Sequence, residues 1–415
     1  MKYIRTCLAA VLITAIAVSI VGCTTIAGAV DLMDGITPQS VTGRQIDETF
    51  TESMADFSIR LFQESITDSE NSLISPLSVM LALAMTTNGA DAETLAELEE
   101  LLGSGIIPIN TLNEYLYSYI GGLPSRENSK LSIANSIWIR NAEALQVEPE
   151  FLQTNADFYH AQIYAADFDD STIREINDWV DKNTDGMIDS VINEIDDEIM
   201  FLINAVAFDA EWENIYHEHA IREGEFTDNS GNKHLVDFMY SVEGRFISDG
   251  LATGFIKHYA GGSYSFVALL PNEGISIDDY IETLTGTGFL DMLENRQFAE
   301  VHASMPKFEY EYEISMLDAL KALGIHEAFE IYGADFSRMA TYSNENIFIS
   351  EVFHKTFISV DERGTRAGAV TVVAPTTSGA PAEKPKIVRL DRPFIFAIVD
   401  SSTDLPIFIG TVLTP

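Results

Sequence analysis

Few groupings of residues in this sequence have the types and spacing that catalysis or metal binding requires. His217, Glu218 and His219 adjoin one another, which is too tight for an H-E-x-x-H zinc site, whose two histidines share one helix face. No G-x-S-x-G nucleophile elbow, C-x-x-C pair or glycine-rich phosphate loop occurs. The sequence therefore predicts no catalytic centre, no metal site and no cofactor.

One stretch begins like an EF-hand calcium loop. Asp181 to Gly186 has the opening oxygen ligands and the turn glycine, and Ile188 stands where such a loop carries an apolar residue. The twelfth position should be a bidentate glutamate, but it is Ile192. We therefore interpret this stretch as a helix that stops at an Asp-Gly pair.

By composition alone the segment from Gly364 to Pro385 could be a linker, but its position and its periodicity argue otherwise. It lacks aromatic residues, carries hardly any charge and lies between two apolar strand-like runs, 347–360 and 387–399. A loop of this length inside a folded domain is usually functional. Residues at a period of two share one face and are small or β-branched: Thr365, Ala367, Ala369, Thr371 and Val373. Since Arg366 falls on the other face, the segment can enter a sheet as a strand without burying a charge.

The elements around this loop predict one large α+β domain over residues 49–415, without internal repeats. Ser75-Pro76 is a favourable helix start, and the run that follows is apolar on all sides, which indicates a buried helix. Further helices are expected over 50–62 and 173–180, strands over 131–139 and 201–208, and a hairpin over 394–413.

The surface is strongly acidic. The chain has 24 Lys and Arg against 64 Asp and Glu, a formal charge of −40. Such a surface repels nucleic acid and anionic lipid headgroups, so we expect no nucleic-acid partner. Because 46% of the residues are hydrophobic, the chain is a packed globular protein.

The N-terminal residues have the features of a secretion signal. Lys2 and Arg5 precede an apolar run over 8–21 that is short for a membrane span, and the run ends in Ile20-Val21-Gly22-Cys23, which resembles a bacterial lipobox. We expect a signal peptide over 1–22, lipidation of Cys23, a flexible tether over 23–48 and an extracellular or cell-surface location. An ordinary secretory signal or an uncleaved anchor is the alternative. Cys7 and Cys23 both lie in this region, so the mature domain has no disulfide.

From Phe50 to Pro415 the chain resembles the serpins, a family of serine protease inhibitors. The resemblance rests on several short motifs that occur in the family's order. They are Ile74–Ser78, Ala134–Trp138, Ile176–Val180, Leu202–Phe208, Met305–Phe308, Val352–Lys355 and Arg392–Phe396. It implies a fold of three β-sheets and about nine helices, with an exposed reactive loop at about 362–386. It also implies a metastable state in which the cleaved loop inserts into the central sheet.

The resemblance assigns roles residue by residue. The matching hinge residues are Glu362, Gly364, Thr365, Ala367, Gly368, Ala369 and Thr371. The residues of the sheet-opening cluster are Ser75, Ser78, Asn204 and His354, with Trp212 near the entry point. Arg363 and Arg366 depart from the acidic residues common in the family's hinge, and both should point to solvent. Because the inserting face has no bulky or charged residue, inhibition is favoured over a non-inhibitory role as a binding or chaperone module.

Counting from the hinge glutamate places the scissile bond between Ser378 and Gly379, flanked by Thr376, Thr377 and Ala380. The register is open by a residue or more, with Thr377, Ala380 and Ala382 as alternatives. All of these residues are small and uncharged, which suits the small or shallow primary pocket of an elastase- or subtilisin-like protease; a trypsin pocket requires a cation. The expected partner is therefore a serine protease, held in a covalent complex by a monomeric inhibitor whose one membrane contact is the lipid on Cys23.

Overall fold

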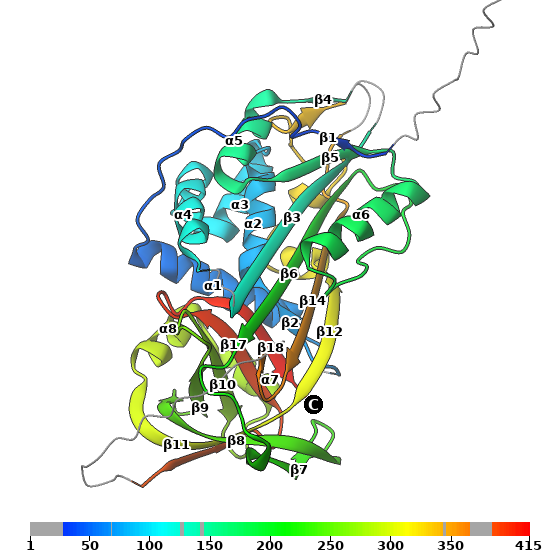
Figure 1. Cartoon of the computed structure of the whole chain (residues 1–415). Helices are drawn as coiled ribbons and strands as arrows, with labels where there is room; N and C mark the ends of the chain where they lie inside the picture. The colour runs from blue at the N-terminus through cyan, green and yellow to red at the C-terminus, as the bar shows by residue number, and fades with distance from the viewer. Residues whose placement is uncertain (1–27, 68, 125–127, 142–144, 343–345, 366–383) are drawn as a thin grey trace, which may run out of the picture.

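The computed structural model describes residues 28–67, 69–124, 128–141, 145–342, 346–365 and 384–415. Within these residues it has nine α-helices and three β-sheets (Figure 1), which confirms the expected α+β architecture. The helices are α1 (Glu48–Ser65), α2 (Pro76–Thr87), α3 (Ala92–Gly103), α4 (Ile109–Gly122), α5 (Pro149–Tyr159), α6 (Asp170–Asn183), α7 (Ile277–Thr283), α8 (Gly286–Glu294) and α9 (Leu317–Ala322).

The central sheet, called sheet A here, has seven strands in the order β1-β5-β3-β6-β15-β14-β12. Its strands are β1 (Val30–Asp31), β5 (Gln162–Ala166), β3 (Ser129–Arg140), β6 (Met200–Glu211), β15 (Gly364–Thr365), β14 (Glu351–Val360) and β12 (Phe308–Ser315). Strands β6 and β14 also pair directly with each other, in parallel, along part of their length. The short strand β15 therefore fills a gap that opens between them only at one end.

A second sheet, sheet B, has nine strands, and a third sheet pairs β4 (Gln146–Val147) with β13 (Ala340–Thr341). The strands of sheet B are β2 (Leu73–Ile74), β7 (Ile221–Thr227), β8 (Lys233–Ser248), β9 (Ala252–His258), β10 (Tyr264–Pro271), β11 (Gln297–Pro306), β16 (Lys386–Arg389), β17 (Phe394–Asp400) and β18 (Pro406–Val412). The expected C-terminal hairpin corresponds to β17 and β18, which pair antiparallel.

Burial explains why the two most apolar segments occupy the centre. Every residue of α2 is buried, and Ser75 caps its start by accepting a hydrogen bond from the Ser78 amide. Strand β6 is covered on both faces. Leu202 and Val206 belong to the main core that contains α2, whereas Ile203 belongs to a smaller core under α6. A strand covered on both faces needs the continuous apolar run found there.

Residues 28–48 do not form the flexible tether that the polar composition suggested. β1 pairs antiparallel with β5, and further hydrogen bonds run from the amides of Leu32, Gln39 and Arg44 to Ile163, Asp157 and Glu114. Four apolar side chains pack against the core: Leu32, Met33, Ile36 and Ile46. These contacts, spread thinly through a polar segment, hold the chain along the domain as far as the start of α1. Cys23 and the rest of residues 1–27 lie outside the described residues.

The stretch that begins like a calcium loop ends a helix. Helix α6 stops at Asn183, and Asp185 and Gly186 then take positive φ values of 53° and 72°, the conformation that ends many helices. The Asp185 carboxylate contacts the ammonium group of Lys130. No helix in the described part of the chain is long and apolar enough to span a bilayer.

Candidate functional site

The first residues of the hinge already lie inside sheet A. Gly364 and Thr365 pair antiparallel with Glu211 and Ala210 of β6, and Thr365 also pairs with Val360 of β14. A Cβ atom added at Gly364 would lie 2.0 Å from the carbonyl oxygen of Ala210, so only glycine fits at this position. The last residues of the hinge that the structure describes, Gly364 and Thr365, thus lie within sheet A.

The side chain of Thr365 faces inward and is 2% exposed. Its hydroxyl forms a 2.6 Å hydrogen bond with the hydroxyl of Tyr259, which stacks on Trp212 with ring centroids 4.5 Å apart. Trp212 in turn binds the backbone that precedes Gly364. Its indole donates to the Asp361 carbonyl at 2.9 Å, and its amide donates to the Arg363 carbonyl at 2.8 Å. The structure therefore places Trp212, stacked on Tyr259, in contact with the residues that lead into the hinge.

An ion pair anchors the residue that precedes these contacts. The Glu362 carboxylate lies 2.6 Å from Nζ of Lys307, and this hydrogen bond lowers the pKa of Glu362 below its usual value. Both side chains are about one-third exposed, so the pair adds little to the free energy of folding. It does hold Glu362 against β12, whose first residue follows Lys307. Arg363 is exposed, as expected.

A buried polar network joins β6, β14 and the start of α2. His354 on β14 lies opposite Asn204 on β6, and its Nδ1 is 2.6 Å from Oδ1 of Asn204. The Ser75 amide donates to Nε2 of His354 at 3.0 Å. Because Nε2 accepts, the proton of the neutral ring is on Nδ1, which donates to Asn204. His354 is fully buried, and this burial lowers its pKa to about 3.

The network continues through Asn135 on β3. The Asn204 side-chain amide donates to Oδ1 of Asn135 at 2.8 Å, and the Ser78 hydroxyl donates to the same oxygen at 3.0 Å. The four residues of the expected sheet-opening cluster are thus brought together, with Asn135 joining Ser78 to the rest. For a strand to pass between β6 and β14, this network must rearrange, because His354 and Asn204 lie on the two strands that separate.

Two residues of this site, Asn135 and Tyr259, were not predicted from the sequence. Asn135 interrupts the apolar face that Ile133 and Ile137 define on β3, and a polar residue at such a position was a usable signal. Tyr259 gave no signal, since nothing in its local sequence indicates a contact with the distant Thr365.

Several predicted residues lie outside the described residues. These are the hinge residues Ala367, Gly368, Ala369 and Thr371, the flanking residues Thr376, Thr377 and Ala380, the bond between Ser378 and Gly379, and Cys23. Their roles stay predictions. In the described part of the chain no three His, Cys, Asp or Glu residues are grouped so as to hold a metal ion.

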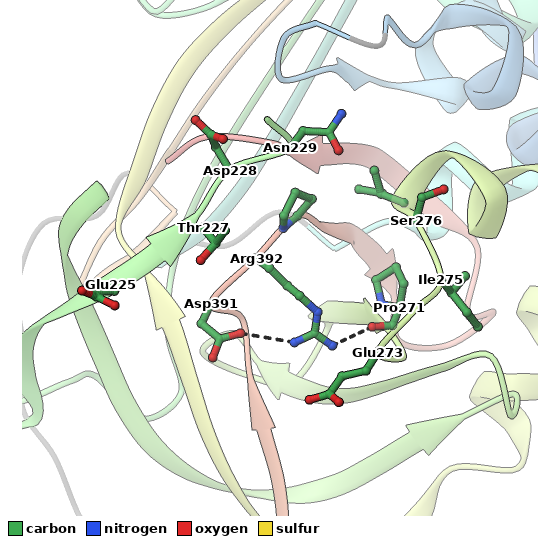
Figure 2. Close-up of a pocket in the computed structure, with 12 residues that line it drawn as sticks. Glu225, Thr227, Asp228, Asn229, Pro271, Glu273, Ile275, Ser276, Asp391 and Arg392 are labelled. Carbon is green, nitrogen blue, oxygen red and sulfur yellow. Dashed lines mark hydrogen bonds and ion pairs between the residues drawn. The ribbon is translucent and has the colours of Figure 1, made fainter. Parts of the chain in front are cut away.

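A separate pocket of about 510 Å³ lies beside the turn that joins β16 to β17 (Figure 2). Glu225, Asp228 and Glu273 line it, together with Arg392. The Arg392 guanidinium is already engaged, because it contacts the Asp391 carboxylate at 3.2 Å and donates to the Pro271 carbonyl at 2.8 Å. We therefore interpret Arg392 as a clamp that fixes the turn into β17.

Comparison with known proteins identifies the family. The model of the family Serpin (serine protease inhibitor) matches residues 52–415. The chain is a serpin. The family is one of serine protease inhibitors and not of enzymes, and it also includes non-inhibitory members.

Relatives at high and low sequence identity agree with this assignment. The serpin shares 54% identity with the crystal structure of the thermophilic serpin tengpin in its native state, with a TM-score of 0.90 over 94% of this chain and 100% of that one. The latent state of tengpin gives a TM-score of 0.79 over 90% of this chain and all of that one, at 50% identity. A serpin-like protein of Thermococcus kodakarensis is 30% identical over 86% of this chain and 84% of its own length. Human neuroserpin is 29% identical over 88% and 91% of the two chains.

Proposed function

We propose that this serpin is an irreversible suicide-substrate inhibitor of serine proteases with a small or shallow primary pocket, of the elastase or subtilisin kind. The observation that carries the proposal is the position of Gly364 and Thr365 between β6 and β14. A sheet that accepts the first residues of the loop at its open end has a path for the following residues, and those residues are small.

The proposed trap uses the chemistry of the protease. The protease serine attacks the carbonyl carbon of Ser378, the bond to the nitrogen of Gly379 breaks, and the new amine leaves with a proton delivered by the protease histidine. The acyl-enzyme then either hydrolyses or is carried along as the freed loop inserts as a new strand between β6 and β14. Insertion that outruns hydrolysis leaves a covalent complex.

The test is to mix the domain with subtilisin and, separately, with an elastase. We expect a complex that survives a denaturing gel and a released C-terminal peptide that begins at or near Gly379. Sequencing that peptide fixes the register of the bond. Clean cleavage without a complex from both proteases would contradict the proposal and favour a non-inhibitory binding or chaperone role.

We also propose that lipid on Cys23 attaches this serpin to the outer face of a membrane. The support is the lipobox-like Ile20-Val21-Gly22-Cys23 after a short apolar run. Stable attachment needs two acyl chains or more. Expression of the full chain in a bacterium that processes lipoproteins should place it in the membrane fraction, and Cys23→Ser should remove its lipid and release it. A membrane-bound Cys23→Ser variant would instead indicate an uncleaved anchor.

A further inference from the structure

A broad open groove of about 1380 Å³ lies on the outer face of β8, β11 and β16. Cross-strand pairing builds its floor. Val242, His302 and Ile387 lie opposite one another on the three strands, and the next row contains Tyr240 and Arg389. The exposed fractions are 65% for Val242 and 62% for Ile387, and Phe298 at one end of β11 is 80% exposed. Large apolar side chains gathered on one face in this way are typical of an interaction surface.

The groove is also cationic, although the protein carries a formal charge of −40. Two basic side chains in it already have carboxylate partners. Lys257 lies 3.0 Å from the Glu243 carboxylate, and His302 lies 2.8 Å from that of Glu300. Arg222 and Arg389 are exposed, and neither forms an ion pair with a carboxylate of the described residues. Arg222 instead lies over the ring of Tyr240 at 5.6 Å.

The position of the groove relates it to the reactive loop. One wall is the segment 214–220, whose Tyr216 amide donates to the carbonyl of Glu362 in the hinge at 2.8 Å. The opposite wall is β16, which begins at Lys386, directly after the loop. The groove therefore lies between the two points at which the loop joins the domain. In Figure 1 strands β7, β8 and β11 gather at the lower end of the molecule, away from helices α2 to α5.

We propose that this groove is a docking surface for the target protease, and that the matching surface of the protease carries carboxylates and apolar residues beside its active-site cleft. The inference rests on the proposed inhibitory function, because the occupant is the protease that reads the loop. Both described ends of the loop border the groove, so a protease bound to the loop is brought close to Arg222 and Arg389, which form no ion pair with a carboxylate of the described residues. Contacts of this kind mainly raise the rate of association, and salt screens them.

The test compares Arg222→Glu, Arg389→Glu and the double variant with the unaltered chain. The measured quantity is the second-order rate constant for loop cleavage, with or without complex formation, by whichever of subtilisin and elastase cleaves faster. We expect the double variant to react at least fivefold more slowly at 20 mM salt, and the difference to shrink below twofold at 1 M salt. The number of serpin molecules consumed per protease inhibited should not change, because both arginines lie on sheet B and not on the strands of sheet A between which the loop is proposed to insert.

Arg174→Glu is the matched control for each single variant, since Arg174 is exposed on α6 outside the groove and the substitution makes the same two-unit charge change. It should leave the rate within twofold. Equal rates for the double variant and the unaltered chain at low salt would overturn the docking surface, as would equal slowing by the control. Sedimentation that shows a dimer dissociated by the double variant would assign the groove to a second copy instead. Loop cleavage is measurable even if no complex forms, so failure of the trap and failure of the docking surface give different results.

Discussion

Thr365→Arg should convert the inhibitor into a substrate. The side chain of Thr365 is buried and bonded to Tyr259, so an arginine there must either bury an unpaired charge or push the hinge out of the sheet. Burying such a charge costs several kcal/mol, and each 1.4 kcal/mol in a barrier is about tenfold in rate. Since trapping competes with hydrolysis of the acyl-enzyme, slower insertion favours hydrolysis. We expect at least a tenfold rise in the serpin consumed per protease inhibited, measured by titration of residual protease activity.

Arg363→Glu is the control for this experiment. It changes the charge by two units at an exposed residue two positions before Thr365. The stoichiometry of this variant should match that of the unaltered chain. A Thr365→Arg variant that still traps with unchanged stoichiometry would show that this side chain does not have to enter the sheet.

His354→Leu should cause a large loss of stability, because His354 lies at the centre of the buried polar network of the sheet-opening cluster. It leaves the Ser75 amide and Oδ1 of Asn204 buried without hydrogen-bond partners. Each such group costs about 1–3 kcal/mol, so we expect the free energy of unfolding to fall by about 3 kcal/mol near pH 7, measured by urea denaturation. His326→Leu, at an exposed histidine, should change it by less than about 0.5 kcal/mol.

The loss of unfolding free energy caused by His354→Leu should become smaller as the pH falls. The pKa of His354 is about 3 in the folded protein, below the usual value of about 6.5 that applies after unfolding. Between these values the unfolded chain binds a proton that the folded chain does not, so stability is highest above pH 6.5 and falls as the pH is lowered towards 3. His354→Leu removes this contribution. The gap between variant and unaltered chain should therefore narrow as the pH falls, and a constant gap would contradict the neutral, buried state of His354.

Helices and strands whose burial is uniform or periodic could be predicted from the sequence. α2 and β6 are buried on all sides at the centre of the domain. Their sequences are therefore mostly apolar, which sequence composition alone reveals. The sheet-opening cluster was predicted only through the family resemblance. A lone Ser75 or His354 does not reveal that residues 279 positions apart share a hydrogen bond.

Two features could not be predicted from local pattern. The Thr365–Tyr259 hydrogen bond depends on how far the loop enters the sheet, which is a balance of packing at distant positions. Residues 28–48 looked like a linker because polar residues and glycines dominate the segment. Their attachment rests on a two-residue strand and a few apolar contacts, which are too sparse to give a period.

The packing of residues 28–48 decides how a lipid-anchored serpin would be displayed. From Cys23 to Gly28 the backbone can reach at most about 18 Å, because an extended residue spans about 3.6 Å. Because β1 is held on the domain, the folded domain of a lipid-anchored chain would lie close to the bilayer. β1 lies at the upper end of the molecule in Figure 1, and β8 and β11 lie at the lower end. An anchor at Cys23 would thus turn the hinge and groove outward, towards proteases that arrive from the surrounding medium.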